Sequence, residues 1–151
     1  NKVKYVVGRA SLIHSVDSLH LAEAIEKESA KKDLVTDILV EVNVAGEKSK
    51  FGLNTDETEE LVRNIAKLPH IRIRGLMTIA PYVDDPEENR QIFRSLKELS
   101  VDIQSKNIDN VLMDILSMGM TNDYEVAIEE GATHVRVGTG IFGERDYSIK
   151  E

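Results

Sequence analysis

The sequence contains no cysteine in its 151 residues, which excludes disulfides, thiolate zinc sites, iron–sulfur clusters and a cysteine nucleophile. Long apolar runs are also lacking, since stretches such as Val111-Leu112-Met113 are far too short to span a bilayer. Acidic residues outnumber basic ones, 27 to 19, and the net charge of −8 argues against a nucleic-acid partner, which would require a basic face. No charged-then-apolar leader opens the chain, so we expect a cytoplasmic protein without a membrane partner.

The composition that remains is typical of a globular domain. The chain is 41% hydrophobic and 30% charged, and its length fits a single domain over residues 1–151. It opens on Asn1 rather than on methionine, with no lead-in before the first structured segment. We therefore expect a portion of a longer protein.

Strand-like and helix-like segments alternate along the chain. The expected strands are residues 11–16, 35–44, 71–79, 110–116 and 133–137, and stripes of apolar residues at helical spacing lie between them. This alternation predicts a parallel sheet of βαβ units. Two α/β architectures fit: part of a (β/α)₈ barrel, which needs eight units in about 250 residues, or a complete five-stranded doubly wound sheet.

In either architecture, ligands bind at the carboxyl ends of the strands. Two glycine-containing loops follow the last two expected strands, at residues 117–123 and 138–143. Glycines let backbone N–H groups approach an anion, and helix N-termini carry unpaired donors. Either loop alone is explained by a tight turn, whereas the two together favour phosphate binding.

Arg136 stands near the end of an otherwise apolar strand. Alternation places it on the same face as His134 and Gly138, beside the second glycine loop. Because a guanidinium is rarely left unpaired in an interior, Arg136 requires an anion or a hydrogen-bond acceptor. A structural salt bridge to Asp114 or Glu41 would satisfy it equally well.

The histidines do not predict a metal site. None of the four lies at i, i+4 spacing from another, and no metal-ligand pattern surrounds them. The run His14-Ser15-Val16-Asp17 contains the residue types of a catalytic triad, but triads are assembled from separate elements.

Five motifs together resemble one known family. They are Ile13-His14-Ser15-Val16-Asp17-Ser18, Val42-Asn43-Val44-Ala45-Gly46-Glu47 with Lys50 and Gly52, Arg74-Gly75-Leu76-Met77, Leu116-Ser117-Met118-Gly119-Met120 with Asp123, and Arg136-Val137-Gly138-Thr139-Gly140-Ile141-Phe142-Gly143 with Arg145. The family is that of the pyridoxal 5′-phosphate homeostasis proteins, the YggS/PROSC group, and the resemblance spans essentially the whole chain. It implies the (β/α)₈ barrel of the alanine racemase N-terminal domain type. This chain would hold about five units, strands four to eight, as the C-terminal two-thirds of the protein.

The resemblance also implies roles for individual residues. The Ser117 hydroxyl and the backbone N–H groups near Gly138 and Thr139 would hold the phosphate of pyridoxal 5′-phosphate. Arg136 would face the pyridine nitrogen, and Met77 would pack against the ring. The lysine that forms the Schiff base lies on the first family strand and has no match here, so no catalytic residue is expected in this chain.

The function that the resemblance implies is the homeostasis of pyridoxal phosphate, a form of vitamin B6, by carriage or buffering without catalytic turnover. Its partners would be the cofactor and the apoenzymes that depend on it. An amino-acid racemase of the alanine type is the enzyme alternative, but it requires a second base on the opposite face of the ring, and racemases place an arginine where this sequence has Lys50. A fragment that binds no cofactor is the third possibility.

Overall fold

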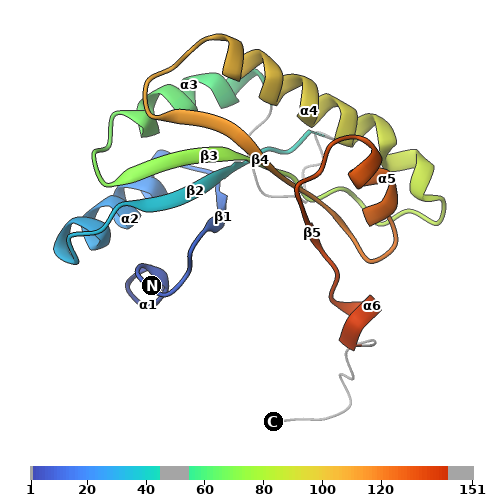
Figure 1. Ribbon diagram of the computed structural model, residues 1–151, viewed down its shortest axis with the longest axis horizontal. Helices are drawn as coiled ribbons and strands as arrows, with labels where there is room; N and C mark the ends of the chain where they lie inside the picture. The colour runs from blue at the N-terminus through green and yellow to red at the C-terminus, as the bar shows by residue number, and fades with distance from the viewer. Residues whose placement is uncertain (1, 45–54, 143–151) are drawn as a thin grey trace.

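The structure, a computed structural model, describes residues 2–44 and 55–142. Within these residues the strands are β1 (Ile13–Val16), β2 (Thr36–Glu41), β3 (Ile71–Met77), β4 (Val111–Met120) and β5 (His134–Arg136). The helices are α1 (Val3–Val6), α2 (Leu19–Lys31), α3 (Thr55–Ala66), α4 (Arg90–Ser105), α5 (Tyr124–Glu129) and α6 (Thr139–Phe142), with a 3-10 turn, η1 (Pro86–Asn89), before α4. Figure 1 shows the sheet as an arch, with α3, α4 and α5 on its convex side.

The order of the strands decides between the two expected architectures. All neighbouring strands are parallel, and the spatial order is β1-β2-β3-β4-β5, the same as the order along the chain. A doubly wound sheet reverses its strand order at a switch point, and this sheet does not. The chain therefore folds as part of a barrel of the alanine racemase N-terminal domain type, and the doubly wound alternative is wrong.

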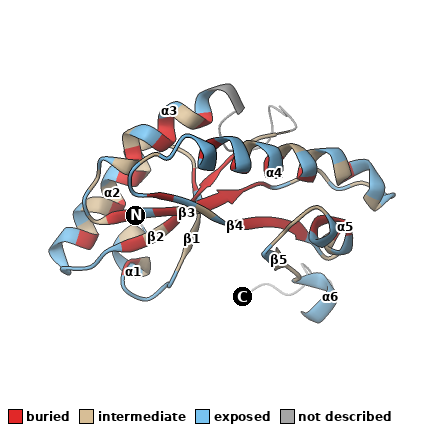
Figure 2. Ribbon diagram, turned by 45° about the horizontal axis from the view of Figure 1, so that its top comes forward, coloured by how far each residue is buried: buried red, intermediate tan, exposed pale blue. Residues whose placement is uncertain are grey.

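Helices α2, α3, α4 and α5 bury apolar side chains against the convex side of the sheet. Helix α2 begins where the Ser18 hydroxyl accepts a hydrogen bond from the Leu21 N–H at 3.1 Å, and Asp85 caps η1 ahead of Pro86. Side chains from the helices and strands form one core, which includes Ile25, Ile38, Val40, Leu76, Phe93, Leu96, Leu116 and Met118. Figure 2 shows the burial concentrated along β2, β3 and β4 and on the helix faces turned toward them.

A second set of side chains lies on the concave side of the arch. Leu39 and Met77 are buried but do not belong to the helix-side core, because they alternate with Val40 and Leu76 along their strands. The concave side is therefore a separate layer, and it corresponds to the barrel interior.

The fourth strand is longer than its sequence indicates. We expected residues 117–123 to form a loop, but β4 continues through Ser117 to Met120, and that expectation is wrong. Gly119 has φ +101°, and the register between β4 and β5 shifts around it, so this glycine forms a bulge rather than ending the strand. A side chain at position 119 would also meet the Cβ of Ala127 at 2.6 Å, so α5 packs directly against the bulge.

Two short helices were not expected from the sequence. Helices α1 and α6 each have four residues, too few to display an apolar stripe. Helix α6 starts at Thr139, inside the predicted phosphate loop. The second motif from residue 45 onward, with Lys50 and Gly52, and the end of the last motif, residues 143–145, lie outside the described residues. Among the described helices, none is long and apolar enough to cross a membrane.

A substitution at Gly75 tests how closely β3 approaches β4. The register of β3 against β2 and β4 shifts here, and a Cβ at position 75 would lie 1.8 Å from the Ile115 carbonyl oxygen. We expect Gly75→Ala to lower the free energy of unfolding by about 1–3 kcal/mol or more, because a backbone atom must move. Urea denaturation measures this change. Gly138→Ala is the matched control, since its Cβ meets no atom within 4 Å; equal stability of both variants would contradict the close approach.

Candidate functional site

A polar layer crosses the concave side of the sheet. Strand register aligns Glu41 with Met77, Met77 with Ser117, and Ser117 with His134. Layers inside such barrels are usually filled by bulky apolar side chains, yet three of these four residues are polar, and Glu41 and Ser117 are buried. An interior layer of this kind is suited to holding a polar ligand or a network of hydrogen bonds.

His14 joins this layer because β1 contains a bulge. Ile13 pairs with Ile38 and Val16 with Val40, so β1 has one more residue than β2 between the two pairings. Regular alternation would place His14 on the same face as Val16, in the helix-side core. Instead the Nδ1 of His14 lies 2.9 Å from the Ser117 hydroxyl oxygen. The rings of His14 and His134 pack edge-on, with their centroids 5.9 Å apart.

Burial and nearby charge disfavour the protonated form of His14. Desolvation lowers the pKa of His14, and the nearby His134 and Arg136 lower it further. Across the layer, burial and the neighbouring Asp17 raise the pKa of Glu41, while Arg136 acts in the opposite direction. The polar layer therefore disfavours charge on both of these titratable groups.

Arg136 lies above the polar layer and lacks one acceptor. Its Nη2 donates to the Thr78 carbonyl oxygen at 2.7 Å, whereas its Nε is buried and has no hydrogen-bond partner among the residues that the structure describes. Burial lowers the pKa of Arg136, opposed by the charges of Glu41 and Asp123. Among residues 2–44 and 55–142, no carboxylate forms an ion pair with it, and the expected alternative partner Asp114 pairs instead with Arg74 at 2.7 Å. A buried N–H without an acceptor is costly, so it indicates a ligand position.

A cleft of about 770 Å³ opens at the carboxyl ends of β3, β4 and β5. Its walls are residues 79–82 after β3, Met120 at the end of β4 with residues 121–123 after it, and Gly138 with Thr139 after β5. A Cβ at Gly138 would meet no atom, so the backbone there faces open space. The Gly140 N–H donates to the Thr121 hydroxyl oxygen at 3.0 Å, which leaves the hydroxyl proton of Thr121 available to another acceptor.

The sequence analysis expected Ser117 at the phosphate and assigned no role to Thr121. The structure brings Thr121, Gly138 and Thr139 together at the cleft, but it places Ser117 in the polar layer against His14. Thr121 is four positions after Ser117, roughly 10–13 Å along a strand, too far for both hydroxyls to hold one phosphate. Met77 lies in the same layer as Ser117. The signal for Thr121 was its place at the end of β4, which the wrong strand boundary concealed.

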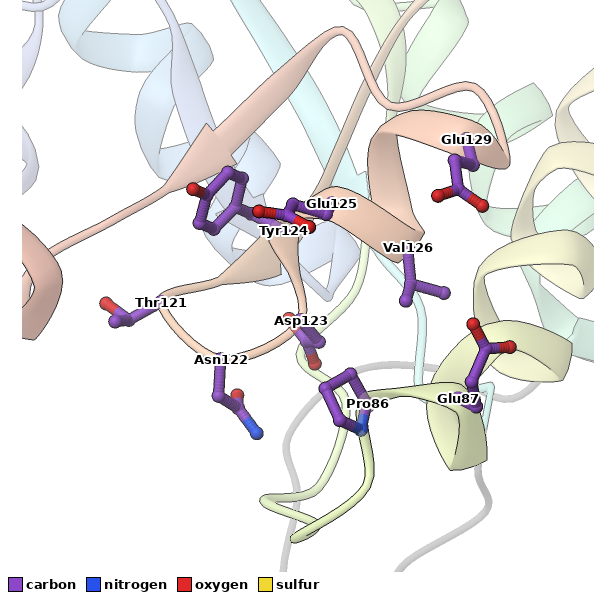
Figure 3. Close-up of a pocket in the computed structure, with 9 residues that line it drawn as sticks. All are labelled: Pro86, Glu87, Thr121, Asn122, Asp123, Tyr124, Glu125, Val126 and Glu129. Carbon is purple, nitrogen blue, oxygen red and sulfur yellow. The ribbon is translucent and has the colours of Figure 1, made fainter.

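The other side of the β4–α5 turn forms a second, smaller pocket of about 350 Å³. Figure 3 shows Glu87 and Glu129 on one side of this pocket and Thr121 on the far side of the turn from them. Three glutamates line it, so it repels a phosphate. The larger cleft, where Asp123 is the one carboxylate among the lining residues, is better suited to an anion.

The wall of the cleft is held by two asparagines. Asn122 Nδ2 donates to the Val83 carbonyl at 2.8 Å, and Asn89 Nδ2 donates both to the Pro81 carbonyl and to Asp123, each at 2.9 Å. Asp123 in turn accepts from the Met120 N–H at 2.7 Å. These bonds join the segment after β3 to the turn after β4, so both walls keep a fixed geometry.

The pKa of His14 predicts a pH effect on stability. As pH falls through its ordinary pKa of 6.5, the unfolded chain takes up this proton before the folded chain does, so stability is lost. Glu41 contributes with the opposite sign, since its raised pKa favours the folded state as pH falls. We expect the free energy of unfolding of the wild type to fall relative to that of His14→Asn as the pH is lowered from about 8 to about 5.5.

Urea denaturation over this pH range measures the difference, in which the Glu41 contribution cancels. His20→Asn is the control for an exposed histidine. A difference that stays constant with pH would contradict the lowered pKa of His14 in the folded protein.

Comparison with known proteins places this chain in a family. Residues 2–146 match the family described as alanine racemase, N-terminal domain. The pyridoxal phosphate homeostasis protein of Aquifex aeolicus is 50% identical over 147 residues, which are 97% of this chain and 64% of that protein. The chain spans 61–64% of the length of such curated relatives.

Solved structures agree with this placement. PipY of Synechococcus elongatus with pyridoxal phosphate bound has a TM-score of 0.84 and 30% identity, covering 95% of this chain and 66% of its own. Alanine racemase of Clostridium difficile in complex with cycloserine has a TM-score of 0.73 and 16% identity, over 95% of this chain and 39% of that one, which shows the shared fold. The chain belongs to the alanine racemase N-terminal domain family, and its curated relatives are the pyridoxal phosphate homeostasis proteins that its motifs resemble.

Proposed function

We propose that this protein binds pyridoxal phosphate in the 770 Å³ cleft and serves in the homeostasis of that cofactor by carrying or buffering it. The observation that carries the proposal is the buried Nε–H of Arg136, which has no acceptor in the structure. Support comes from PipY, a relative solved with pyridoxal phosphate bound, and from the names of the curated relatives.

Arg136 fits a pyridine ring nitrogen. A guanidinium keeps its protons at physiological pH, so its Nε–H offers a donor and never an acceptor. A pyridine nitrogen facing that donor must be unprotonated. The Thr78 carbonyl occupies Nη2, which leaves Nε as the donor for the ring.

The phosphate fits the other end of the cleft. The backbone at Gly138 faces open space, and Thr139 opens α6, where the N–H groups have no acceptor within the helix. The Thr121 hydroxyl has its proton free to donate. These groups would hold the phosphate, while Ser117, expected at the phosphate, and Met77 would face the ring from the polar layer.

When bound, pyridoxal phosphate supplies an aldehyde that reacts with amines and a ring that withdraws electrons. Arg136 would keep the ring nitrogen unprotonated, which weakens that withdrawal and suits carriage rather than racemisation. The apoenzymes that require the cofactor would be the partners, and the cytoplasm would be the location.

Arg136→Glu tests the ring contact. We expect the pyridine nitrogen of bound pyridoxal phosphate to become protonated, because a carboxyl group stabilises the positive charge that a guanidinium disfavours. Nitrogen-15 NMR of ring-labelled cofactor reads this directly, since the chemical shift depends on protonation. Arg94→Glu, at an exposed position on α4, is the matched control. An unchanged ring signal in Arg136→Glu would show that this arginine is only structural.

Thr121→Val and Ser117→Ala test the phosphate contact. The probes are deoxypyridoxine phosphate, which lacks the aldehyde and reports non-covalent binding, and deoxypyridoxine, which also lacks the phosphate. We expect Thr121→Val to reduce the preference for the phosphorylated probe by about 1.5–3 kcal/mol, the usual cost of a lost hydrogen bond to a charged group. Ser117→Ala should leave that preference unchanged. The reverse result, measured by calorimetric titration, would assign the phosphate to Ser117.

A further inference from the structure

Thr78 connects three strands at the edge of the cleft. It is the first residue after β3, and it is 1% exposed. Its N–H donates to the Ser117 carbonyl of β4 at 3.1 Å, and its hydroxyl donates to the Val42 carbonyl beyond β2 at 2.6 Å. Its own carbonyl accepts from Nη2 of Arg136 on β5 at 2.7 Å.

The hydroxyl extends the pairing of β2 and β3 by one step. The aligned pairs end at Glu41 and Met77, and the Val42 N–H then donates to the Met77 carbonyl at 2.8 Å. The following acceptor, the Val42 carbonyl, receives the Thr78 side chain. This bond fixes the backbone of Thr78 where the chain leaves the sheet, and so fixes the direction of its carbonyl.

That carbonyl determines where Arg136 points. Within the described parts of the chain it is the one hydrogen-bond acceptor of this guanidinium, and Glu41 acts on Arg136 through charge alone. A planar guanidinium held at Nη2 has its Nε–H direction restricted as well. The orientation of the free donor therefore depends on a residue that does not itself reach the ligand.

We propose that Thr78 is a positioning residue for Arg136, and that its hydroxyl bond to Val42 fixes the direction in which the Nε–H of Arg136 points. The ligand consequence of this inference rests on the proposed function, because it concerns the pyridine nitrogen that Arg136 would face. The orientation of Arg136 itself does not, and it is measurable in ligand-free protein.

The test removes the hydroxyl while keeping the shape of the side chain. Thr78→Val deletes the bond to Val42, and Thr78→Ser restores it. Thr36→Val is the matched control, because Thr36 is also buried and its hydroxyl is 2.6 Å from the Ser29 hydroxyl, near the opposite ends of the strands. If Thr78→Val does not fold, Thr78→Ser and Thr78→Ala give the same comparison. Both lack the γ-methyl group of threonine, and only serine keeps the hydroxyl.

The first measurement is hydrogen exchange at the Nε–H of Arg136 in ligand-free protein labelled with nitrogen-15 arginine. We expect about tenfold faster exchange in Thr78→Val, and wild-type rates in Thr78→Ser and Thr36→Val. The bond between the Thr78 hydroxyl and the Val42 carbonyl is worth about one decade in an equilibrium constant, and its loss lets the guanidinium leave its buried position that much more often. Wild-type exchange in Thr78→Val would overturn the positioning role.

The second measurement is the affinity for deoxypyridoxine phosphate, with the ring nitrogen signal recorded when the probe is bound. Thr78→Val should bind about tenfold more weakly and lose the wild-type ring signal, and Thr78→Ser should recover both. If the wild type does not bind the probe, the proposed function fails while the exchange result still decides the role of Thr78. If the wild type binds and Thr78→Val matches it in both readouts, the positioning role is wrong.

Discussion

A buried guanidinium must find acceptors for its protons, and this requirement organises the concave side of the sheet. Arg136 receives one acceptor from the Thr78 carbonyl and keeps a second donor, Nε–H, without a partner. Removing a charged group from water is tolerated when the remaining donors are used. The cleft at the carboxyl ends of β3, β4 and β5, the open space at the Gly138 backbone and the polar layer beneath are consistent with a ligand that supplies the missing acceptor.

Irregularities in the strands place most of the residues around that arginine. The bulge in β1 turns His14 inward toward Ser117, and the bulge at Gly119 carries β4 on to Met120 beside the cleft. Each extra residue reverses the alternation for the part of the strand that follows it. The polar layer and the cleft therefore depend on departures from ideal sheet geometry, which cluster on the ligand side of the sheet.

The sequence predicted the regular features well and the irregular ones poorly. Alternation identified five parallel strands and put Arg136 and His134 on one face, and the family motifs implied the barrel that the strand order confirms. Single-residue bulges leave no periodic signal, so His14 was assigned no role, and Gly119 was interpreted as the mark of a loop. Thr121 and Thr78 were missed because their importance comes from backbone contacts with Gly140 and Arg136, which are distant in sequence.

The crystal structure of the protein with pyridoxal phosphate bound tests the central claim most directly. The account predicts the ring nitrogen within about 3 Å of Arg136 Nε, the usual hydrogen-bond distance, with the phosphate between Thr121 and the backbone of Gly138 and Thr139. Arg136 would keep its bond to the Thr78 carbonyl. A ring bound elsewhere, or a phosphate on the guanidinium of Arg136, would contradict the account.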